Sequence, residues 1–150
     1  MESTETEQPV TEARPAPAPP VRDAQYQAIG RRKTSVARVY LRPGSGAWMV
    51  NGRSLEQHLP RHVLRQSAIR PLVATETEGQ FDVKVTVKGG GLRGQADAIR
   101  LGVARALLKV DEDFRRRLRT ESLLTRDPRE VERKKPGRPG ARKRFQFSKR

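Results

Sequence analysis

The sequence contains no cysteine, which excludes disulfide bonds, thiolate metal sites and cysteine nucleophiles. Histidine is scarce as well. His58 and His62 are spaced four apart, as metal ligands on a helix can be, but Pro60 lies between them and no third ligand is evident. We therefore predict no metal site and no cofactor. No catalytic signature links the serine, histidine and aspartate residues, so hydrolase chemistry has no support and we expect no enzyme activity and no small-molecule substrate.

Long apolar runs are missing too, and none approaches the length that crosses a bilayer. The N-terminus lacks the basic-then-apolar order of a secretory signal, and its acidic residues argue against a transit peptide. These features predict a soluble cytoplasmic protein that does not bind membranes.

Positive charge is what the chain has in excess, with 32 Lys and Arg against 17 Asp and Glu and a net charge of +15. The charge is uneven, because residues 1–24 are net acidic while residues 133–150 carry nine cations and no acid. A basic body with a more basic arm is typical of nucleic-acid binding. DNA-compacting proteins and proteins bound to anionic membranes share this charge distribution, so charge alone leaves those alternatives open.

Composition divides the chain into three parts. Residues 1–24 are acidic and rich in proline, which predicts a disordered extension. Residues 25–125 contain the periodic apolar patterns of a folded domain. Residues 126–150 are predicted to form an extended basic tail, because prolines and glycines at positions 136–140 exclude a helix and like charges repel. Such a tail becomes ordered against a dense anion, and a polyphosphate backbone is the obvious candidate.

The middle part predicts a two-layer α+β domain with a mixed sheet and helices. Alternating residues predict strands over 36–42, 48–50 and 81–87, and apolar spacing or capping signals predict helices over 54–59, 62–69 and 92–110, with another opened by residues 111–113. We expect the second helix to end before Pro71. Gly102 inside the long helix suggests close backbone packing there.

The sharpest short motif is Gly89-Gly-Gly-Leu-Arg-Gly-Gln95, which satisfies the G-x-G-x-x-G pattern of dinucleotide-binding loops. The second parallel strand that such a site needs is absent, and no Gly-Lys-Ser/Thr follows, so a nucleotide-binding enzyme is a minor alternative. Flexible backbone N–H groups at a helix N-terminus suit an RNA phosphate, although the glycines also suit a tight turn.

Further cations precede and follow this domain. Gly30-Arg-Arg-Lys-Thr-Ser35 places three of them ahead of the strand over 36–42, where we favour phosphate contacts over an ordinary solvated turn. In the arm, Phe145 and Phe147 have no core of their own, so they can stack on unpaired bases or fill gaps in an RNA or protein surface.

Taken together, these motifs resemble the family of the ninth protein of the small ribosomal subunit, in its bacterial form, from Tyr26 to Arg150. The resemblance is carried by the following segments: Gly30–Lys33, Ala37–Val39, Leu41–Gly44, Val50–Gly52, Gly89–Gly91 with Gly94-Gln95, Ala104–Leu107, Leu124–Asp127, Val131–Lys135 and Gln146–Arg150. An aromatic residue usually follows the Glu-Arg-Lys-Lys run of the family; Pro136 stands there in this chain.

The resemblance implies a fold shared with the second domain of the fifth small-subunit protein, seated on rRNA in the subunit head. It implies three kinds of partner: the 16S rRNA, neighbouring head proteins and the tRNA bound in the peptidyl site, towards which the tail runs. The positions expected at rRNA, from the motifs and the resemblance together, are Arg31, Arg32, Lys33, Arg38, Gly89, Gly90, Gly91, Arg93, Gly94, Gln95, Arg126, Arg133, Lys134, Lys135, Arg138, Arg142, Lys143 and Arg144. Ser148, Lys149 and Arg150 inherit the contact with the tRNA anticodon stem-loop. A free nucleic-acid chaperone remains the alternative to a ribosomal role.

Overall fold

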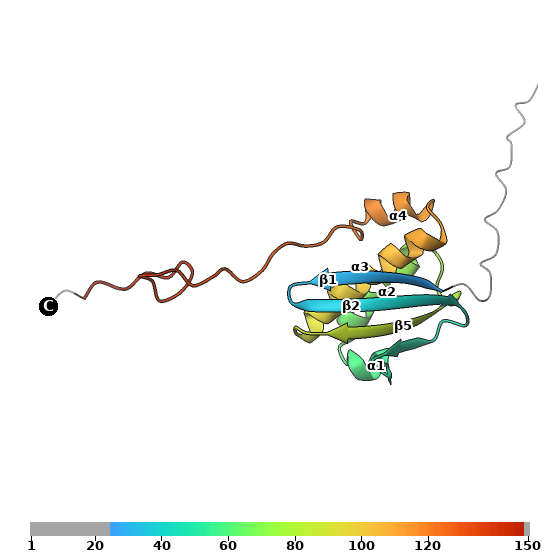
Figure 1. Ribbon diagram of the computed structural model, residues 1–150, viewed down its shortest axis with the longest axis horizontal. Helices are drawn as coiled ribbons and strands as arrows, with labels where there is room; N and C mark the ends of the chain where they lie inside the picture. The colour runs from blue at the N-terminus through green and yellow to red at the C-terminus, as the bar shows by residue number, and fades with distance from the viewer. Residues whose placement is uncertain (1–24, 149–150) are drawn as a thin grey trace, which may run out of the picture.

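The alternating residues around Val39 lie in a five-stranded sheet in the computed structural model of the protein, which describes residues 25–148 (Figure 1). The strands are β1 (Tyr26–Arg32), β2 (Ser35–Pro43), β3 (Trp48–Val50), β4 (Arg53–Ser54) and β5 (Phe81–Lys88). Their order is β1-β2-β5-β3-β4, with β3 parallel to β5 and all other pairs antiparallel. The predicted mixed α+β architecture is confirmed. The predicted extension over residues 1–24 lies outside the described residues.

Strand β1 corrects the sequence interpretation, because the segment Gly30–Lys33 was expected ahead of the first strand. Gly30 and the two arginines after it lie inside β1, which pairs along its length with β2. The inward positions of β1 include Ala28, which has only a methyl group, and Gly30, which has no side chain, so no apolar alternation marks the strand in the sequence. Pairing with β2 and packing against a helix therefore decide its conformation.

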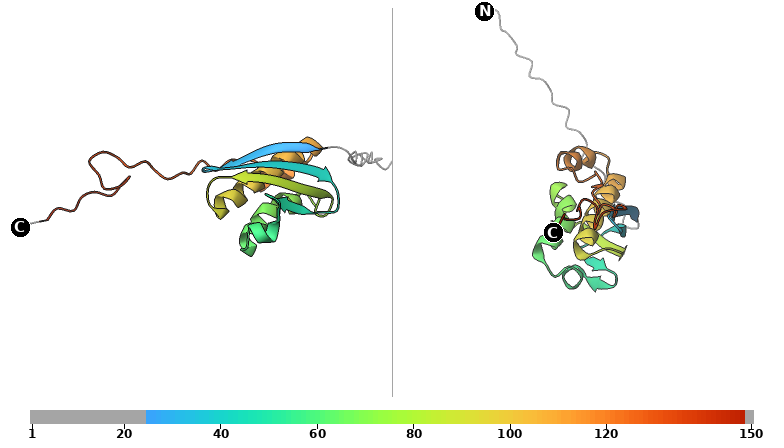
Figure 2. Two further views of the ribbon diagram at one scale, coloured as in Figure 1. Left: turned by 60° about the horizontal axis from the view of Figure 1, so that its bottom comes forward. Right: turned by 90° about the vertical axis from the view of Figure 1, so that its left-hand side faces the viewer.

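Helices cover one face of the sheet and leave the other open (Figures 1 and 2). They are α1 (Leu55–His58), α2 (His62–Ala74), α3 (Leu92–Val110) and α4 (Phe114–Thr120). The predicted bounds of α3 are confirmed. Helix α1 is capped as predicted by Ser54, whose hydroxyl accepts a hydrogen bond from the Gln57 backbone N–H at 3.3 Å.

Helix α2 does not end before Pro71, as the sequence predicted, but continues through it to Ala74. Pro71 and Leu72 are buried against the body, and this packing offsets the backbone hydrogen bond that proline lacks. The last turn is closed by Thr75, whose hydroxyl donates to the Pro71 carbonyl at 3.0 Å. Tertiary packing and this C-terminal cap thus override the local signal.

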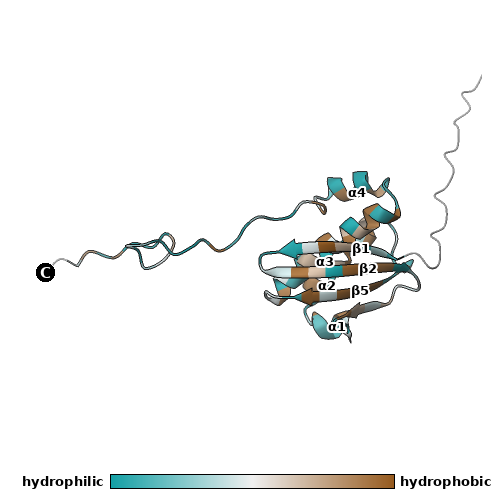
Figure 3. Cartoon of the chain, viewed as in Figure 1, coloured by the Kyte–Doolittle hydropathy of each residue, from teal (hydrophilic) through white to brown (hydrophobic). Residues whose placement is uncertain are grey.

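The core lies between the sheet and α3. Apolar and polar residues alternate along the strands (Figure 3), so Val39 and Leu41 of β2 point to α3 and are fully buried. Close packing at Gly102 is confirmed, because a Cβ there would lie 2.6 Å from Val39 Cγ2. Leu118 holds α4 against the body and has no exposed surface.

The segment after α4 leaves the body, and residues 121–148 form no helix or strand (Figures 1 and 2). It is not extended throughout. Arg142 folds back on Glu132, with Nε 3.0 Å from Oε2, and closes a small loop. The side chains of Phe145 and Phe147 beyond this loop are exposed.

Candidate nucleic-acid interface

The open face of the sheet gathers cations from three neighbouring strands. Strand register places Arg38 of β2 beside Ile29 of β1 and Thr86 of β5. The adjacent rows contain Lys84 beside Tyr40, and Lys88 in one row with Arg31. All of these side chains alternate with buried ones, so they project away from the helices. The result is a surface with cations on β1, β2 and β5.

Acidic residues are nearly absent from the sheet. The five strands carry seven Arg or Lys but a single acid, Asp82, next to Arg42 in the register. Asp82 is engaged locally, since its Oδ1 accepts the backbone N–H groups of Ser45 and Ala47, each at 2.9 Å. Chiefly the Ala47 hydrogen bond lowers the pKa of Asp82. Because these hydrogen bonds already engage Asp82, the cations on the open face have no carboxylate partner within residues 25–148.

Apolar side chains lie among these cations. Ile29 and Met49 are 40% and 51% exposed, and Tyr40 is half-buried between them in the sheet. Aromatic and aliphatic groups surrounded by cations can contact sugars and bases while the cations hold phosphates. Lys84, Lys88 and Arg42 were absent from the predicted site. Their alternation with buried residues could have indicated them, but only the strand order places them together.

The glycine motif forms the turn between β5 and α3. Gly89 and Gly90 have φ values of 75° and 67°, which favour glycine, and a Cβ on either would collide with Thr34 or Ser35. The Ser35 hydroxyl and the Gln95 amide both donate to the Gly89 carbonyl, at 3.0 and 3.1 Å. Most of the motif is therefore explained by the packing of this turn.

Two neighbours of this turn remain accessible. A Cβ at Gly91 would meet no atom within 4 Å, and the side chain of Arg93 is exposed. Gly94 is tighter, because a Cβ there would lie 2.9 Å from the Ser35 hydroxyl. His58 contacts the same turn through Gln95, with Nε2 2.8 Å from Oε1, and no group of three potential metal ligands occurs in residues 25–148.

Arg32 points to the helical side of the sheet, unlike Arg31, and its side chain is only 12% exposed. Its Nη2 lies 2.8 Å from Asp127 Oδ2, and its Nε lies 3.7 Å from Asp97 Oδ2. Its Nη1 donates to the Asp127 carbonyl at 3.1 Å and to the Arg129 carbonyl at 2.6 Å. The predicted phosphate ligand is thus engaged within the protein.

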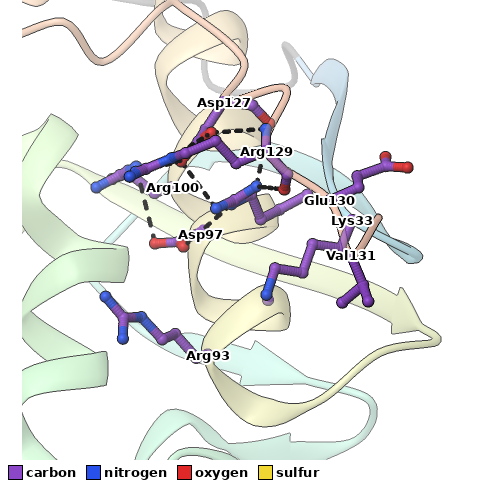
Figure 4. A pocket seen from close by; sticks show the side chains of 10 residues that line it. Lys33, Arg93, Asp97, Arg100, Asp127, Arg129, Glu130 and Val131 are labelled. Atoms are coloured by element: carbon purple, nitrogen blue, oxygen red, sulfur yellow. Dashed lines mark hydrogen bonds and ion pairs between the residues drawn. The ribbon is translucent and has the colours of Figure 1, made fainter. Parts of the chain in front are cut away.

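A cavity of about 500 Å³ opens beside Arg32 and is lined by Lys33, Arg93, Arg100 and Val131 among others (Figure 4). Asp127 lines it too. Hydrogen bonds from the Arg129 side chain and backbone, followed by the charges of Arg129 and Arg32, hold the pKa of Asp127 well below its usual range. The carboxylate is therefore ionised at neutral pH.

The cations of the C-terminal segment differ in whether the protein itself binds them. Arg126 pairs with Glu130 and Arg142 pairs with Glu132, and the latter contact lowers the pKa of Glu132 and raises that of Arg142. In the part of the chain that the structure describes, Arg133 donates only to the carbonyl of Lys134. No partner within the described residues binds the side chains of the remaining members: Lys134, Lys135, Arg138, Lys143 and Arg144. Ser148 is exposed, whereas Lys149 and Arg150 lie outside the described residues.

No helix within residues 25–148 is both long and apolar enough to cross a bilayer.

Comparison with known proteins identifies a family that the chain matches. A family model described as ribosomal protein S9/S16 matches residues 30–150. The chain is 62% identical over 126 residues to the small ribosomal subunit protein uS9 of Gemmatimonas aurantiaca, covering 84% of this chain and 98% of that protein. The protein of the same name from Porphyromonas gingivalis is 54% identical over 123 residues, which cover 82% of this chain and 96% of that protein. The one from Chlorobium limicola is 57% identical over 122 residues, which cover 81% of this chain and 95% of that protein.

Proposed function

The chain belongs to the ribosomal protein S9/S16 family, and we infer from this membership that it is a structural constituent of the small subunit of the cytoplasmic ribosome, not an enzyme. We propose that residues 25–125 are the domain seated on 16S rRNA, with the fold of the second domain of the fifth small-subunit protein. The burial of Leu123, 3% exposed, supports that boundary.

We propose that the open face of the sheet is the body's main rRNA contact. The observation that carries this proposal is the charge segregation, since the outward positions of β1, β2 and β5 carry five Arg or Lys and a single acid, which is engaged in a turn. Arg31 and Arg38 bind phosphates together with Lys84 and Lys88. Lys33, Gly91 and Arg93 extend this contact around the edge of the sheet.

The test is the salt dependence of binding to a transcript of the small-subunit rRNA. Each phosphate contact that is lost reduces the slope of log K against log salt by about 0.7–0.9. We therefore expect a clear fall in slope for the double variant Arg38→Gln/Lys84→Gln. The matched control is Arg70→Gln/Arg117→Gln, which removes two cations that already pair with Glu121 and Glu76. Equal slopes for the two double variants would contradict the proposed face.

The tail over residues 126–150 is the second contact. We propose that its cations neutralise phosphates where RNA helices crowd, because five of them have no partner within the described residues and both nearby phenylalanines are exposed. Deleting residues 133–150 should reduce the yield of assembled subunits in sedimentation gradients, and a normal yield would argue against this role. The same gradients separate a ribosomal protein from a free chaperone.

The end of the tail is proposed to contact the tRNA in the peptidyl site through Ser148, Lys149 and Arg150, and the body to contact neighbouring head proteins. Deleting residues 148–150 should leave subunit incorporation intact and weaken tRNA binding or frame maintenance. Unchanged tRNA affinity and error rate would refute this contact.

A further inference from the structure

The cluster of Asp97, Arg32 and Asp127 joins three elements that are far apart in the sequence. Arg32 ends β1, Asp97 lies in α3, and Asp127 lies in the segment that leaves the body. The Arg32 guanidinium contacts both carboxylates and also binds two backbone carbonyls of that segment. Each of its three nitrogens thus has at least one contact.

This arrangement holds the segment more firmly than a surface ion pair would. The Arg32 side chain is 12% exposed, and the Asp97 and Asp127 side chains are 21% and 25% exposed, so water screens the charges only in part. Arg129 closes a local turn on the same carboxylate, since its backbone N–H donates to Asp127 Oδ1 at 2.9 Å. Beyond this turn the segment leaves the body, since the side chain of Val131 lies at the edge of the cavity and is 90% exposed.

We propose that Arg32 is a positioning residue that sets the direction in which the C-terminal tail leaves the body, by holding Asp127 against Asp97. Fixing the first residues of a tail reduces the conformational freedom that is lost when the rest binds. The effect on RNA binding rests on the proposed function of the tail; the orientation itself does not.

The orientation is tested in the free, full-length protein. The chain has no native cysteine, so Thr86→Cys on the open face and Val131→Cys carry a single pair of spin labels. We call the contacts of Arg32 with Asp97 and Asp127 the joint. Pulsed electron paramagnetic resonance should give a narrow distance distribution for the protein with its natural joint and a broad one for Asp127→Asn. Arg32→Gln should broaden the distance distribution as well. If Arg32→Gln fails to fold, Asp127→Asn still tests the orientation, because Asp127 lies outside the core. Equal distributions would overturn the proposal.

The effect on RNA binding is tested with two variants that are expected to change the affinity in different directions. Removing an acid from a basic protein should strengthen RNA binding. The control Glu130→Gln, three residues away and paired with Arg126 alone among residues 25–148, should do so or have no effect. Asp127→Asn removes the same charge but also the carboxylate that Arg32 holds, and should weaken affinity for the rRNA transcript about tenfold.

Each result has one meaning. If Asp127→Asn binds the transcript as tightly as Glu130→Gln while its distances broaden, a role of the joint in RNA binding is refuted. If the natural protein itself fails to bind the transcript, the proposed function fails instead, and the distance measurement still decides the orientation.

Discussion

Gly30→Ala should strongly destabilise the protein, although it adds a single methyl group to an outer strand. A Cβ at this position would lie 1.9 Å from the Ala98 carbonyl oxygen and 2.4 Å from the Gly102 nitrogen. Both are backbone atoms of α3, which cannot move separately from their helix. To restore an ordinary contact, α3 would have to retreat from β1 by about 1.5 Å, and a gap of that order forfeits much of the dispersion energy along its buried face.

The expected magnitude follows from that displacement. Helix α3 buries nine residues, including Ile99 and Leu107, so a shift loosens most of the core. Overpacking usually costs about 1–3 kcal/mol, and we expect at least about 3 kcal/mol here because no flexible side chain can yield. Against the 5–15 kcal/mol of stability that is usual for a whole domain, that is a large share.

Urea unfolding of the full chain measures this loss, with Gly102→Ala and Gly91→Ala as comparisons. At Gly102 the obstacle is a side-chain methyl of Val39 at 2.6 Å, and alanine gains about 1 kcal/mol of helix propensity, so the net cost should be smaller. Adding Val39→Ala should relieve Gly102→Ala but not Gly30→Ala. At Gly91 a Cβ meets nothing within 4 Å, so little change is expected. A Gly30→Ala protein within about 0.5 kcal/mol of the natural one would refute the reasoning.

Three further predictions concern the turn after β2, the edge of β1 and helix α4. The pKa of Asp82 in the folded protein lies below its ordinary 3.8, so the hydrogen bond from Ala47 to the ionised carboxylate stabilises the fold above that pH. This stabilisation is lost as the pH falls through the folded pKa. The difference in unfolding free energy between the natural protein and Asp82→Asn should therefore stay constant above about pH 5 and shrink below about pH 4. Arg105 donates to the Ile29 carbonyl on the outer edge of β1 at 2.9 Å, so Arg105→Ala should uncover that edge and raise aggregation in light scattering, whereas unchanged scattering would show that the edge is protected otherwise. Leu118→Ala should cost about 2–5 kcal/mol in urea unfolding, since Leu118 is fully buried, and a smaller loss would mean that α4 is not held by this side chain.

Local patterns in the sequence were enough for several elements. The stripe of apolar residues from Ile99 to Val110 predicted α3 with its observed bounds, and the alternation from Phe81 onwards predicted β5. Ser54 and Gln57 predicted the start of α1. These signals succeed because the period of burial is written into neighbouring residues, and a helix or strand needs only that period.

Other elements depended on distant partners. Strand β1 has glycine and alanine at inward positions, and only its pairing with β2 and the close approach of α3 at Gly30 make it a strand. Helix α2 passes through Pro71 because the proline is buried against the body. In both cases tertiary packing outweighs a local preference of about 1–3 kcal/mol.

The same division holds for the site. The sequence by itself determined that the chain carries an excess of cations on alternating strand positions and in a tail without a core, since composition and period are local properties. Only the tertiary structure decided which cations lie together on one face and which are engaged. Arg31 and Arg32 are adjacent in sequence, yet one lies on the open face and the other binds Asp127, which is 95 residues away along the chain. Charge can be counted along a chain, but the partner that neutralises it is chosen by how strands and helices pack.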